Sequence, residues 1–192
     1  MQRLVIATTN AGKVIEIRSA LGSVPGWFLD PVPPGTPAIE ETGTTFLANA
    51  ILKAEHYSKF TPDLTLADDS GLCVTSLGGQ PGVHSARYAE NPTARIQRVL
   101  HEMQSVSGPG RDAVFYCALA LAQFGNIIWT VQREVAGFIA RSPSGTEGFG
   151  YDPIFFLPEK LRTMAELNTD EKNLLSARGK ALADLRKFLL TS

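Results

Sequence analysis

The chain begins with a short apolar segment that runs directly into a polar loop and then into a helical pattern. Residues 4–7 are apolar, residues 8–13 read TTNAGK, and apolar residues recur at helical spacing from Val14 to Leu21. Gly22 follows at the position of a helix C-cap. A strand, a polar loop and a helix in this order predict the start of an α/β domain.

The polar loop matches a nucleotide phosphate-binding loop at some positions and departs from it at two. That pattern requires an early Gly, and it requires a Ser or Thr directly after its Lys to bind magnesium. Here Ala7 stands at the first position, and Val14 follows Lys13. The loop can therefore offer backbone N–H groups and one cation to phosphates, and a magnesium ion would have to be held elsewhere.

The middle of the chain continues the mixture of helices and strands. Residues 31–43 contain four Pro and two Gly, which predicts an extended surface loop. Apolar residues at helical spacing predict a helix over about residues 45–59. Residues 64–67 and 72–77 predict two strand segments on either side of the polar residues 68–71.

The second half of the chain predicts further antiparallel strands and a final helix. A helix is expected to begin with Pro92 in its first turn. Two β-rich runs, at residues 113–124 and 127–139, flank Gly125-Asn126, which predicts a two-residue hairpin turn. Helical spacing returns over residues 181–189. The predicted fold class is α/β with a mixed sheet.

Composition limits the class of protein and its partners. A chain of 192 residues is long enough to bury one core, so one domain is expected. Lys and Arg total 18 and Asp and Glu total 19, a net charge of -1 that disfavours nucleic acid as a partner. No apolar run approaches the roughly 20 residues of a membrane span. The two cysteines, Cys73 and Cys117, lie in apolar stretches, which predicts reduced thiols in a cytoplasmic protein without a membrane partner.

Two adjacent carboxylates, Asp68 and Asp69, follow the apolar residues 64–67. Open α/β sheets present ligand-binding groups where strands end, and neighbouring carboxylates repel each other unless a cation compensates. Magnesium prefers a few carboxylate oxygens with water and phosphates, so Asp69 with Glu40 or Glu41 from the long loop predicts a magnesium site. The same pair is also compatible with an acidic turn in which Asp68 caps backbone amides.

Lys13 in the loop and Lys53 at the inner edge of a helix are the cations available to a triphosphate. Taken alone, each is more typical of a solvated surface lysine. Together with the carboxylates, they predict a site where magnesium and lysine neutralise phosphate charge while Asp69 activates water. Lys53 and Asp68 are therefore assigned to catalysis beside Asp69.

Residues 148–153, GFGYDP, combine two glycines, two aromatic residues and an acid. Phe149 could stack on a flat nucleobase while Asp152 accepts a ring N–H, although an aromatic loop packed on the core would look the same. Further along, Lys172 and Arg178 flank Ser176. Arg178 could donate to an exocyclic oxygen of a base, or it could be a solvated charge at a helix terminus.

Six segments, taken in order, resemble one protein family throughout the chain. They are ATTNAGK at 7–13, EETGTTFLANAILKA at 40–54, ADDSGL at 67–72, LGGQPGVHSARYA at 77–89, GFGYDPIFF at 148–156, and residues 176–182. The family is that of the non-canonical purine nucleoside triphosphate pyrophosphatases, which hydrolyse inosine and xanthosine triphosphates. The resemblance covers essentially the whole chain.

The resemblance implies roles for the candidate residues. Asp69 is implied to be catalytic and a magnesium ligand. The residues implied to bind the triphosphate, the base or the sugar are Thr8, Thr9, Asn10, Ala11, Gly12, Lys13, Ser70, Phe149, Gly150, Tyr151, Asp152, Lys172, Ala177 and Arg178. The family has Ser-His-Arg-Gly where this chain has Ser176-Ala177-Arg178-Gly179, so an imidazole is absent beside the arginine.

The resemblance also implies a fold and a reaction. The implied fold is an elongated mixed sheet flanked by helices, forming one domain of two lobes with the nucleotide in a central cleft, usually as a homodimer. The implied reaction is attack of water on the α-phosphorus of ITP, dITP or XTP, giving the monophosphate and pyrophosphate. Two alternatives stay open: a related pyrophosphatase of pyrimidine or modified nucleotides, and a nucleotide-binding sensor without turnover.

Overall fold

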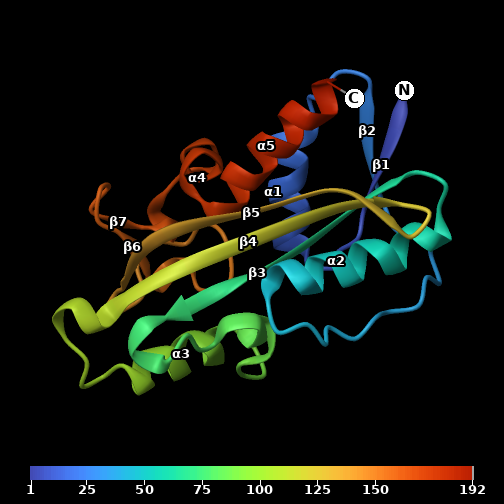
Figure 1. Cartoon of the computed structure of the whole chain (residues 1–192). Coiled ribbons are helices and arrows are strands. Elements are labelled where there is room, and N and C mark those ends of the chain that lie inside the picture. The colour runs from blue at the N-terminus through green and yellow to red at the C-terminus, as the bar shows by residue number, and fades with distance from the viewer. Residues whose placement is uncertain (192) are drawn as a thin grey trace. The chain divides into compact units, whose positions relative to one another are not determined.

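A seven-stranded mixed sheet flanked by helices forms the protein, as the computed structural model of residues 1–191 shows (Figure 1). The sheet order is β2-β1-β3-β4-β5-β6-β7. The strands are β1 (Gln2–Ile6), β2 (Trp27–Pro31), β3 (Leu64–Val74), β4 (Asp112–Gln123), β5 (Asn126–Ile139), β6 (Phe155–Leu157) and β7 (Arg162–Thr163). The helices are α1 (Ala11–Leu21), α2 (Phe46–Tyr57), α3 (Pro92–Glu102), α4 (Thr169–Leu175) and α5 (Ala177–Thr191). The predicted α/β class with a mixed sheet is confirmed.

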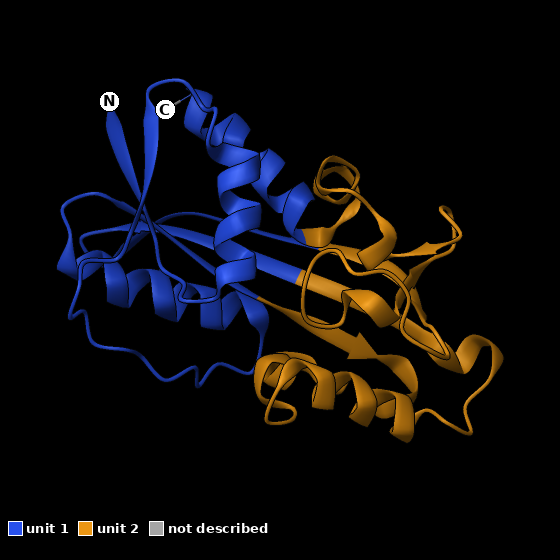
Figure 2. Cartoon of the chain, turned by 180° about the vertical axis from the view of Figure 1, so that it is seen from behind, with its two compact units in different colours: residues 1–69, 117–133, 178–192 blue, residues 70–116, 134–177 orange. Residues whose placement is uncertain are grey.

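The chain is organised into two compact units, which are coloured separately in Figure 2. Unit 1 consists of residues 1–69, 117–133 and 178–192, and unit 2 consists of residues 70–116 and 134–177. Each unit is assembled from segments that are distant in sequence, so neither unit corresponds to one continuous part of the chain.

The strands of unit 1 begin with a parallel arrangement. β1 pairs in parallel with β2, with Leu4 opposite Leu29, and with β3, with Leu4 opposite Leu64. Leu4, Val5 and Ile6 of β1 are buried, as expected for a parallel strand whose two faces are both covered by helices. In both views, α2 lies on one side of the unit 1 strands, while α1 and α5 lie on the other (Figures 1 and 2).

Side-chain caps explain where three helices begin. Asn10 Oδ1 accepts a hydrogen bond from Lys13 N at the start of α1, and Thr45 Oγ1 accepts one from Ala48 N at the start of α2. Asn91 Oδ1 does the same for α3, which carries Pro92 in its first turn as predicted. The predicted polar loop over residues 8–13 is too long at its C-terminal end. The helix α1 begins at Ala11, so Ala11 to Lys13 already form its first turn.

The predicted end of a strand at Asp68 is wrong. β3 is one continuous strand from Leu64 to Val74 and passes through residues 68–71 without a break. Turn-forming residue types suggested an acidic loop here, but Asp68 and Asp69 are buried and satisfied by residues from other elements. The alternative of an acidic turn is wrong for the same reason.

The predicted hairpin between the two long β-rich runs is present with its turn shifted by one residue. β4 ends at Gln123 and β5 begins at Asn126, so the two connecting residues are Phe124 and Gly125. Both have positive φ, 52° and 79°, as a two-residue hairpin turn requires. Phe124 adopts this conformation although glycine or asparagine is the usual residue there.

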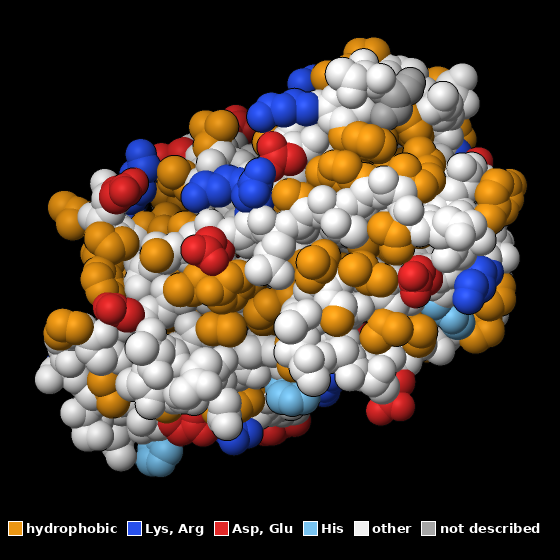
Figure 3. Space-filling view, viewed as in Figure 1, with side chains coloured by type: hydrophobic (Ala, Val, Ile, Leu, Met, Phe, Trp, Pro, Cys, Tyr) orange, Lys and Arg blue, Asp and Glu red, His pale blue; other side chains and the backbone are white. Residues whose placement is uncertain are grey.

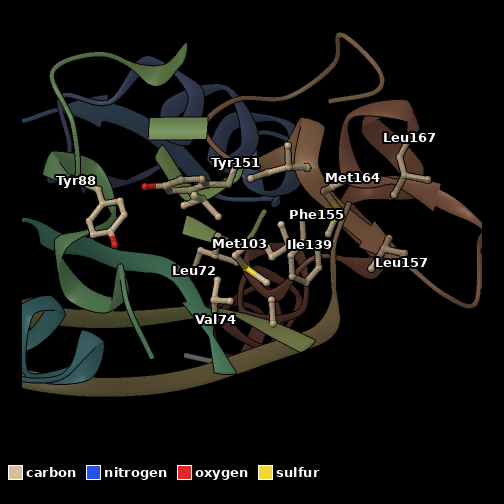
Figure 4. Close-up of a cluster of buried hydrophobic side chains, with 13 residues drawn as sticks. Leu72, Val74, Tyr88, Met103, Ile139, Tyr151, Phe155, Leu157, Met164 and Leu167 are labelled. Carbon is tan, nitrogen blue, oxygen red and sulfur yellow. The ribbon is translucent and has the colours of Figure 1, made fainter. Parts of the chain in front are cut away.

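Unit 2 has its own hydrophobic core, drawn in Figure 4. It joins residues of β3 and α3 to residues that follow β5, and Phe155 packs edge-on against Phe115 with ring centroids 4.8 Å apart. Tyr151 belongs to this cluster and is buried. One flank of the predicted base-binding loop is therefore anchored in the core of unit 2.

Charges of both signs are interspersed on the face seen in Figure 3, without a single-sign patch dominating that view. Within residues 1–191, no helix is both long and apolar enough to cross a membrane.

Candidate active site

The first part of the candidate site is the start of α1 in unit 1. Thr8 Oγ1 accepts a hydrogen bond from Asn10 N at 3.2 Å, and Asn10 caps the helix. Thr9, Asn10 and Ala11 are exposed, and Gly12 is partly exposed. The N-terminus of an eleven-residue helix is a favourable environment for an anion.

Lys13 connects this helix start to the carboxylate of Asp68. Its ammonium contacts Asp68 Oδ1 and lies 3.5 Å from the Asp68 carbonyl oxygen. Arg178, from the first turn of α5, donates through Nε to Asp68 Oδ2 at 3.0 Å and through Nη1 to Glu16 of α1 at 2.5 Å. Asp68 is only 1% exposed. The carboxylate is thus enclosed by cations from two helices.

These contacts determine the charge of Asp68. Burial alone would raise the pKa of the carboxyl, but Arg178 and Lys13 outweigh burial and hold its pKa well below the ordinary aspartate value. Asp68 is therefore a permanent anion at neutral pH that anchors Lys13 and Arg178.

Asp69 has a different set of partners, most of them on α2. Its Oδ2 accepts from Asn49 Nδ2 at 3.1 Å, and its Oδ1 lies 3.5 Å from Lys53 Nζ. Lys53 Nζ also donates to Glu41 Oε1 at 2.6 Å, so one ammonium lies between two carboxylates. Burial opposes the charge on Lys53, but Asp69 and Glu41 outweigh it and raise the pKa of this lysine. Lys53 is accordingly a cation.

The pKa of Asp69 is shifted in the direction opposite to that of Asp68. Burial raises the pKa of Asp69, and Lys53 and Lys13 offset only part of that effect. Two carboxyl groups whose environments separate their pKa values are suited to different tasks. Asp68 is suited to hold cations, and Asp69 is the better proton acceptor of the two because its conjugate acid is weaker.

The arrangement around Lys53 also bears on metal binding. Glu41 and Asp69 both approach the Lys53 ammonium, so both direct an oxygen at one cation, whereas Glu40 is exposed. Within the part of the chain that the structure describes, no group of three or more His, Cys, Asp or Glu side chains is placed to hold a metal ion. Magnesium needs only one or two carboxylates when phosphates and water complete its shell, and the Glu41–Asp69 pair fits that requirement.

Several residues of this site escaped sequence reasoning. Asn49 is fully buried, and besides donating to Asp69 it accepts from Gly43 N at 2.7 Å, which ties the loop that carries Glu41 to α2. A Cβ on Gly43 would lie 2.6 Å from Asn49 Oδ1, so this contact requires glycine. Asn49 was detectable as the polar residue four positions before Lys53 on an otherwise apolar helix face.

Glu16 and Cys117 were missed as well. Glu16 is a buried acid that pairs with Arg178 across 162 positions, and Cys117 donates to Asp68 Oδ2 at 3.1 Å. The only sequence signal for Glu16 was its place beside the apolar residues of α1. Cys117 lies in an apolar run that gave no indication of a polar partner.

The predicted base-binding residues in unit 2 form a second polar cluster. Asp152 Oδ2 accepts from Phe149 N at 2.7 Å and from Lys172 Nζ at 2.5 Å. Lys172 Nζ also lies 5.0 Å from the centroid of the Phe149 ring. Phe149 is partly exposed, while Asp152 and Lys172 are buried. The structure therefore brings together three of the predicted residues and leaves Phe149 partly exposed.

The neighbours of this cluster are held by the core. Tyr151 donates to the carbonyl oxygen of Ser85 at 2.9 Å and is part of the unit 2 core (Figure 4). Gly148 has φ +75°, and a Cβ there would meet Asp152 Oδ2 and would lie 2.7 Å from Lys172 Nζ. Gly150 also has positive φ, +64°, with open space around it. Glycine at 148 thus allows the Asp152–Lys172 pair to form.

The remaining predicted residues occupy separate places. Ser70 is a half-buried residue of β3 in unit 2, and Ala177 is buried at the start of α5. Arg178 belongs to unit 1, and its contacts include those with Asp68 and Glu16. Its contact with a nucleobase stays a prediction.

Comparison with known proteins agrees with the sequence resemblance. A model of the Ham1 family matches residues 4–188. A dITP/XTP pyrophosphatase of Bacillus licheniformis is 46% identical over 193 residues and covers 98% of each chain. One of Geobacillus kaustophilus is 48% identical over 190 residues, covering 96% of this chain and 93% of the relative. The solved structure of a HAM1 protein from Coxiella burnetii has a TM-score of 0.88 at 41% identity and covers 100% of both chains. This chain therefore belongs to the Ham1 family.

Proposed function

We propose that this protein is a nucleoside triphosphate pyrophosphatase that hydrolyses dITP, ITP and XTP to the monophosphate and pyrophosphate. Relatives that are 46–48% identical over nearly their full length are dITP/XTP pyrophosphatases, which supports this activity. Removal of these nucleotides would cleanse the nucleotide pool.

The observation that carries the proposal is the separation of tasks between Asp68 and Asp69. One carboxylate is locked between Lys13 and Arg178, and its neighbour, with a raised pKa, faces Lys53 and Glu41. Hydrolysis of a phosphoanhydride needs cations that neutralise phosphate charge and a base that activates water. Both kinds of group are present in unit 1.

Magnesium is the proposed cofactor, held by Asp69 and Glu41, whose oxygens already approach a common cation. When bound, it would neutralise charge on the phosphates and orient them for in-line displacement. Glu40 is a less suitable ligand because it is exposed and Glu41 is the one that meets Lys53.

The start of α1 is proposed to bind the phosphates. The N-terminus of α1 is a favourable environment for anions, and Lys13 adds a charge that Asp68 holds in place. Lys53 supplies a second ammonium, and Ser70, next to Asp69, is proposed to contact the substrate. Such preorganised donors stabilise charge in the transition state without reorganisation during the reaction.

Asp69 is proposed to orient the attacking water and accept its proton. The water oxygen bonds to the α-phosphorus, the bond to the bridging oxygen of the β-phosphate breaks, and pyrophosphate leaves with the electron pair. Asn49 keeps the carboxylate oriented through its hydrogen bond to Oδ2. Lys53, 3.5 Å from the other oxygen, favours the ionised form that can accept a proton.

Residues of unit 2 are proposed to recognise the base. Phe149 is partly exposed, and Asp152 and Lys172 form a buried charged pair beside it. Gly150 and Tyr151 shape the same loop, and Ala177 and Arg178 remain proposed contacts of the base or sugar. A 6-oxo group accepts hydrogen bonds where the adenine amino group donates them, so a donor directed at this position would discriminate against ATP.

The assembly and location are further parts of the proposal. A homodimer is proposed from the sequence resemblance. A cytoplasmic location is supported by two free cysteines, Cys73 and Cys117, since reduced thiols are typical of that compartment.

Pyrophosphate release over a panel of nucleoside triphosphates, with and without magnesium, tests this function. The expected result is release from dITP, ITP and XTP that requires the metal and greatly exceeds release from ATP and pyrimidine nucleotides. Preference for a pyrimidine nucleotide would favour the related pyrophosphatase group. Tight dITP binding with no product would favour a sensor.

A further inference from the structure

Cys117 is a buried thiol beside the charged cluster of unit 1, and the proposed reaction has no step that requires it. It lies in β4, the strand next to β3, and is 1% exposed. Its Sγ donates to Asp68 Oδ2 at 3.1 Å. The next five residues of β4 are buried alanines and leucines, so the thiol brings a donor to Asp68 from an apolar strand.

The donors around Asp68 divide between its two oxygens. Arg178 Nε and Cys117 Sγ approach Oδ2, at 3.0 Å and 3.1 Å, while the Lys13 ammonium contacts Oδ1. Two donors from different elements on one oxygen fix the plane of the carboxylate more firmly than one donor does. Oδ1 then stays directed at Lys13, in the first turn of α1.

The thiol is in the state that can donate. Burial raises the pKa of Cys117 well above its ordinary value, and the neighbouring Asp68 charge raises it further. The side chain therefore stays protonated at neutral pH. A thiol is a weak donor, but a charged acceptor strengthens the hydrogen bond that it makes.

We propose that Cys117 is a positioning residue for phosphate binding: its S–H orients Asp68, and through Asp68 it holds the Lys13 ammonium at the start of α1. The part that concerns phosphates rests on the proposed function, whereas the contact between the thiol and the carboxylate does not.

Infrared spectroscopy tests the contact without any substrate. The chain has two cysteines, so in a Cys73→Ser protein the S–H stretching band belongs to Cys117 alone. We expect that band at a lower frequency than that of an unbonded thiol, because donation to a carboxylate weakens the S–H bond. The shift should become smaller in Cys73→Ser/Asp68→Asn, where the acceptor is neutral. A band at the unbonded frequency in both proteins would overturn the proposal.

Kinetics with dITP test the consequence. Cys117→Ala should raise KM about two- to thirteenfold, the effect of losing one hydrogen bond of about 0.5–1.5 kcal/mol, with a smaller change in kcat. Cys117→Ser, which keeps a donor, should restore most of the loss. Cys73→Ala, which removes the thiol of unit 2, is the matched control and should leave KM unchanged.

The possible outcomes separate the two proposals. An unchanged KM in Cys117→Ala would overturn the positioning role, and so would an equal rise in the Ala and Ser variants, since that would indicate packing rather than donation. If the wild-type protein releases no pyrophosphate from any nucleotide while the infrared shift is present, the proposed function fails and the thiol–carboxylate contact stands.

Discussion

Asp68 and Asp69 are consecutive residues of β3, yet their carboxylates are held by helices on opposite sides of the strand. Asp68 meets Lys13 of α1 and Arg178 of α5, whereas Asp69 meets Asn49 and Lys53 of α2. Side chains alternate across a strand, so one dipeptide can supply a carboxylate to each face. The two groups consequently differ in pKa, Asp68 below and Asp69 above the ordinary value.

Neutralising these two carboxyl groups should affect stability in opposite directions. Asp68→Asn should lower the free energy of unfolding at pH 7 by about 3–5 kcal/mol, because Arg178 and Lys13 lose a buried partner. Asp69→Asn should raise it, because a raised pKa means that the folded protein disfavours the ionised form. Urea unfolding of both variants in the presence of a chelator measures the difference. A loss of stability of similar size in both variants would contradict the opposite pKa shifts assigned to Asp68 and Asp69.

The pH dependence of the same measurement follows from the direction of each shift. A depressed pKa contributes stability that is present above the unfolded value of about 3.9 and is lost as the pH falls through the folded value. The difference in the free energy of unfolding between wild type and Asp68→Asn should therefore become smaller as the pH falls below about 4. The folded-state pKa of Asp69 is raised, so the protein loses stability as the pH rises and this carboxyl ionises. The increase in the free energy of unfolding caused by Asp69→Asn should therefore disappear in acid, where Asp69 is protonated.

The sequence indicated the importance of residues 68 and 69 but not their setting. Asp-Asp-Ser-Gly is typical of a turn, and the strand continues through it because Lys13, Lys53 and Arg178 compensate the charges. The contact between Asp68 and Arg178 spans 110 positions, which no local pattern reveals. Helices with clear periodicity and caps, such as α2 and α3, were predictable because their signals are local.

Lys53 should compete with a divalent metal in the absence of nucleotide. Its ammonium lies 2.6 Å from Glu41 Oε1 and 3.5 Å from Asp69 Oδ1, where the metal would need both oxygens. Lys53→Met should tighten Mn²⁺ binding about tenfold or more, since a like charge at about 4 Å costs ~1–4 kcal/mol. Titration of free Mn²⁺ by electron paramagnetic resonance measures this affinity.

The matched control for that titration is Lys59→Met, which removes an exposed lysine of the same unit. It should leave the affinity for Mn²⁺ unchanged. Equal or weaker Mn²⁺ binding by Lys53→Met would show that the lysine does not occupy the position of the metal. In turnover assays Lys53→Met should lower kcat, because the phosphates lose a cation.

Asn49 should influence the acidic limb of the pH profile of kcat/KM. Its donation to Asp69 lowers the pKa of that carboxyl against the larger effect of burial. Asn49→Ala should therefore raise this pKa, and the acidic limb of kcat/KM should move to higher pH. Asn126→Ala, at the exposed first residue of β5, is the control and should show the wild-type profile. A coincident profile for Asn49→Ala would exclude Asp69 as the base that titrates there.

A comparison of alanine variants at two glycines of the loop before Asp152 should distinguish a steric clash of the new side chain from the cost of positive φ. Gly148 and Gly150 both have positive φ, where a side chain costs about 1–2 kcal/mol, but only at 148 would a Cβ meet Asp152 and Lys172. Gly148→Ala should therefore lower stability more than Gly150→Ala and should raise the KM for dITP more. Thermal unfolding and steady-state kinetics measure the two effects. Equal losses would mean that the Asp152–Lys172 pair does not depend on glycine at 148.

One strand and one ion pair were not predicted from the sequence. The strand β2 was not anticipated, because its five residues pair only with β1 at the sheet edge and end at Pro31. Asp152 and Lys172 were each read as contacts of a base, and the structure shows that they also pair with each other across 20 positions. Long-range pairing of buried charges is settled by tertiary packing and leaves no periodic pattern.

The most direct test of the account is the rate of pyrophosphate release from dITP by Asp69→Asn at saturating magnesium and nucleotide. Loss of the group that accepts the proton of water should lower kcat by about 10²–10⁴-fold. The stability of the variant, expected to equal or exceed that of wild type, shows that the loss is chemical. A kcat near that of wild type would contradict the assignment of Asp69 as the base and, with it, the proposed mechanism.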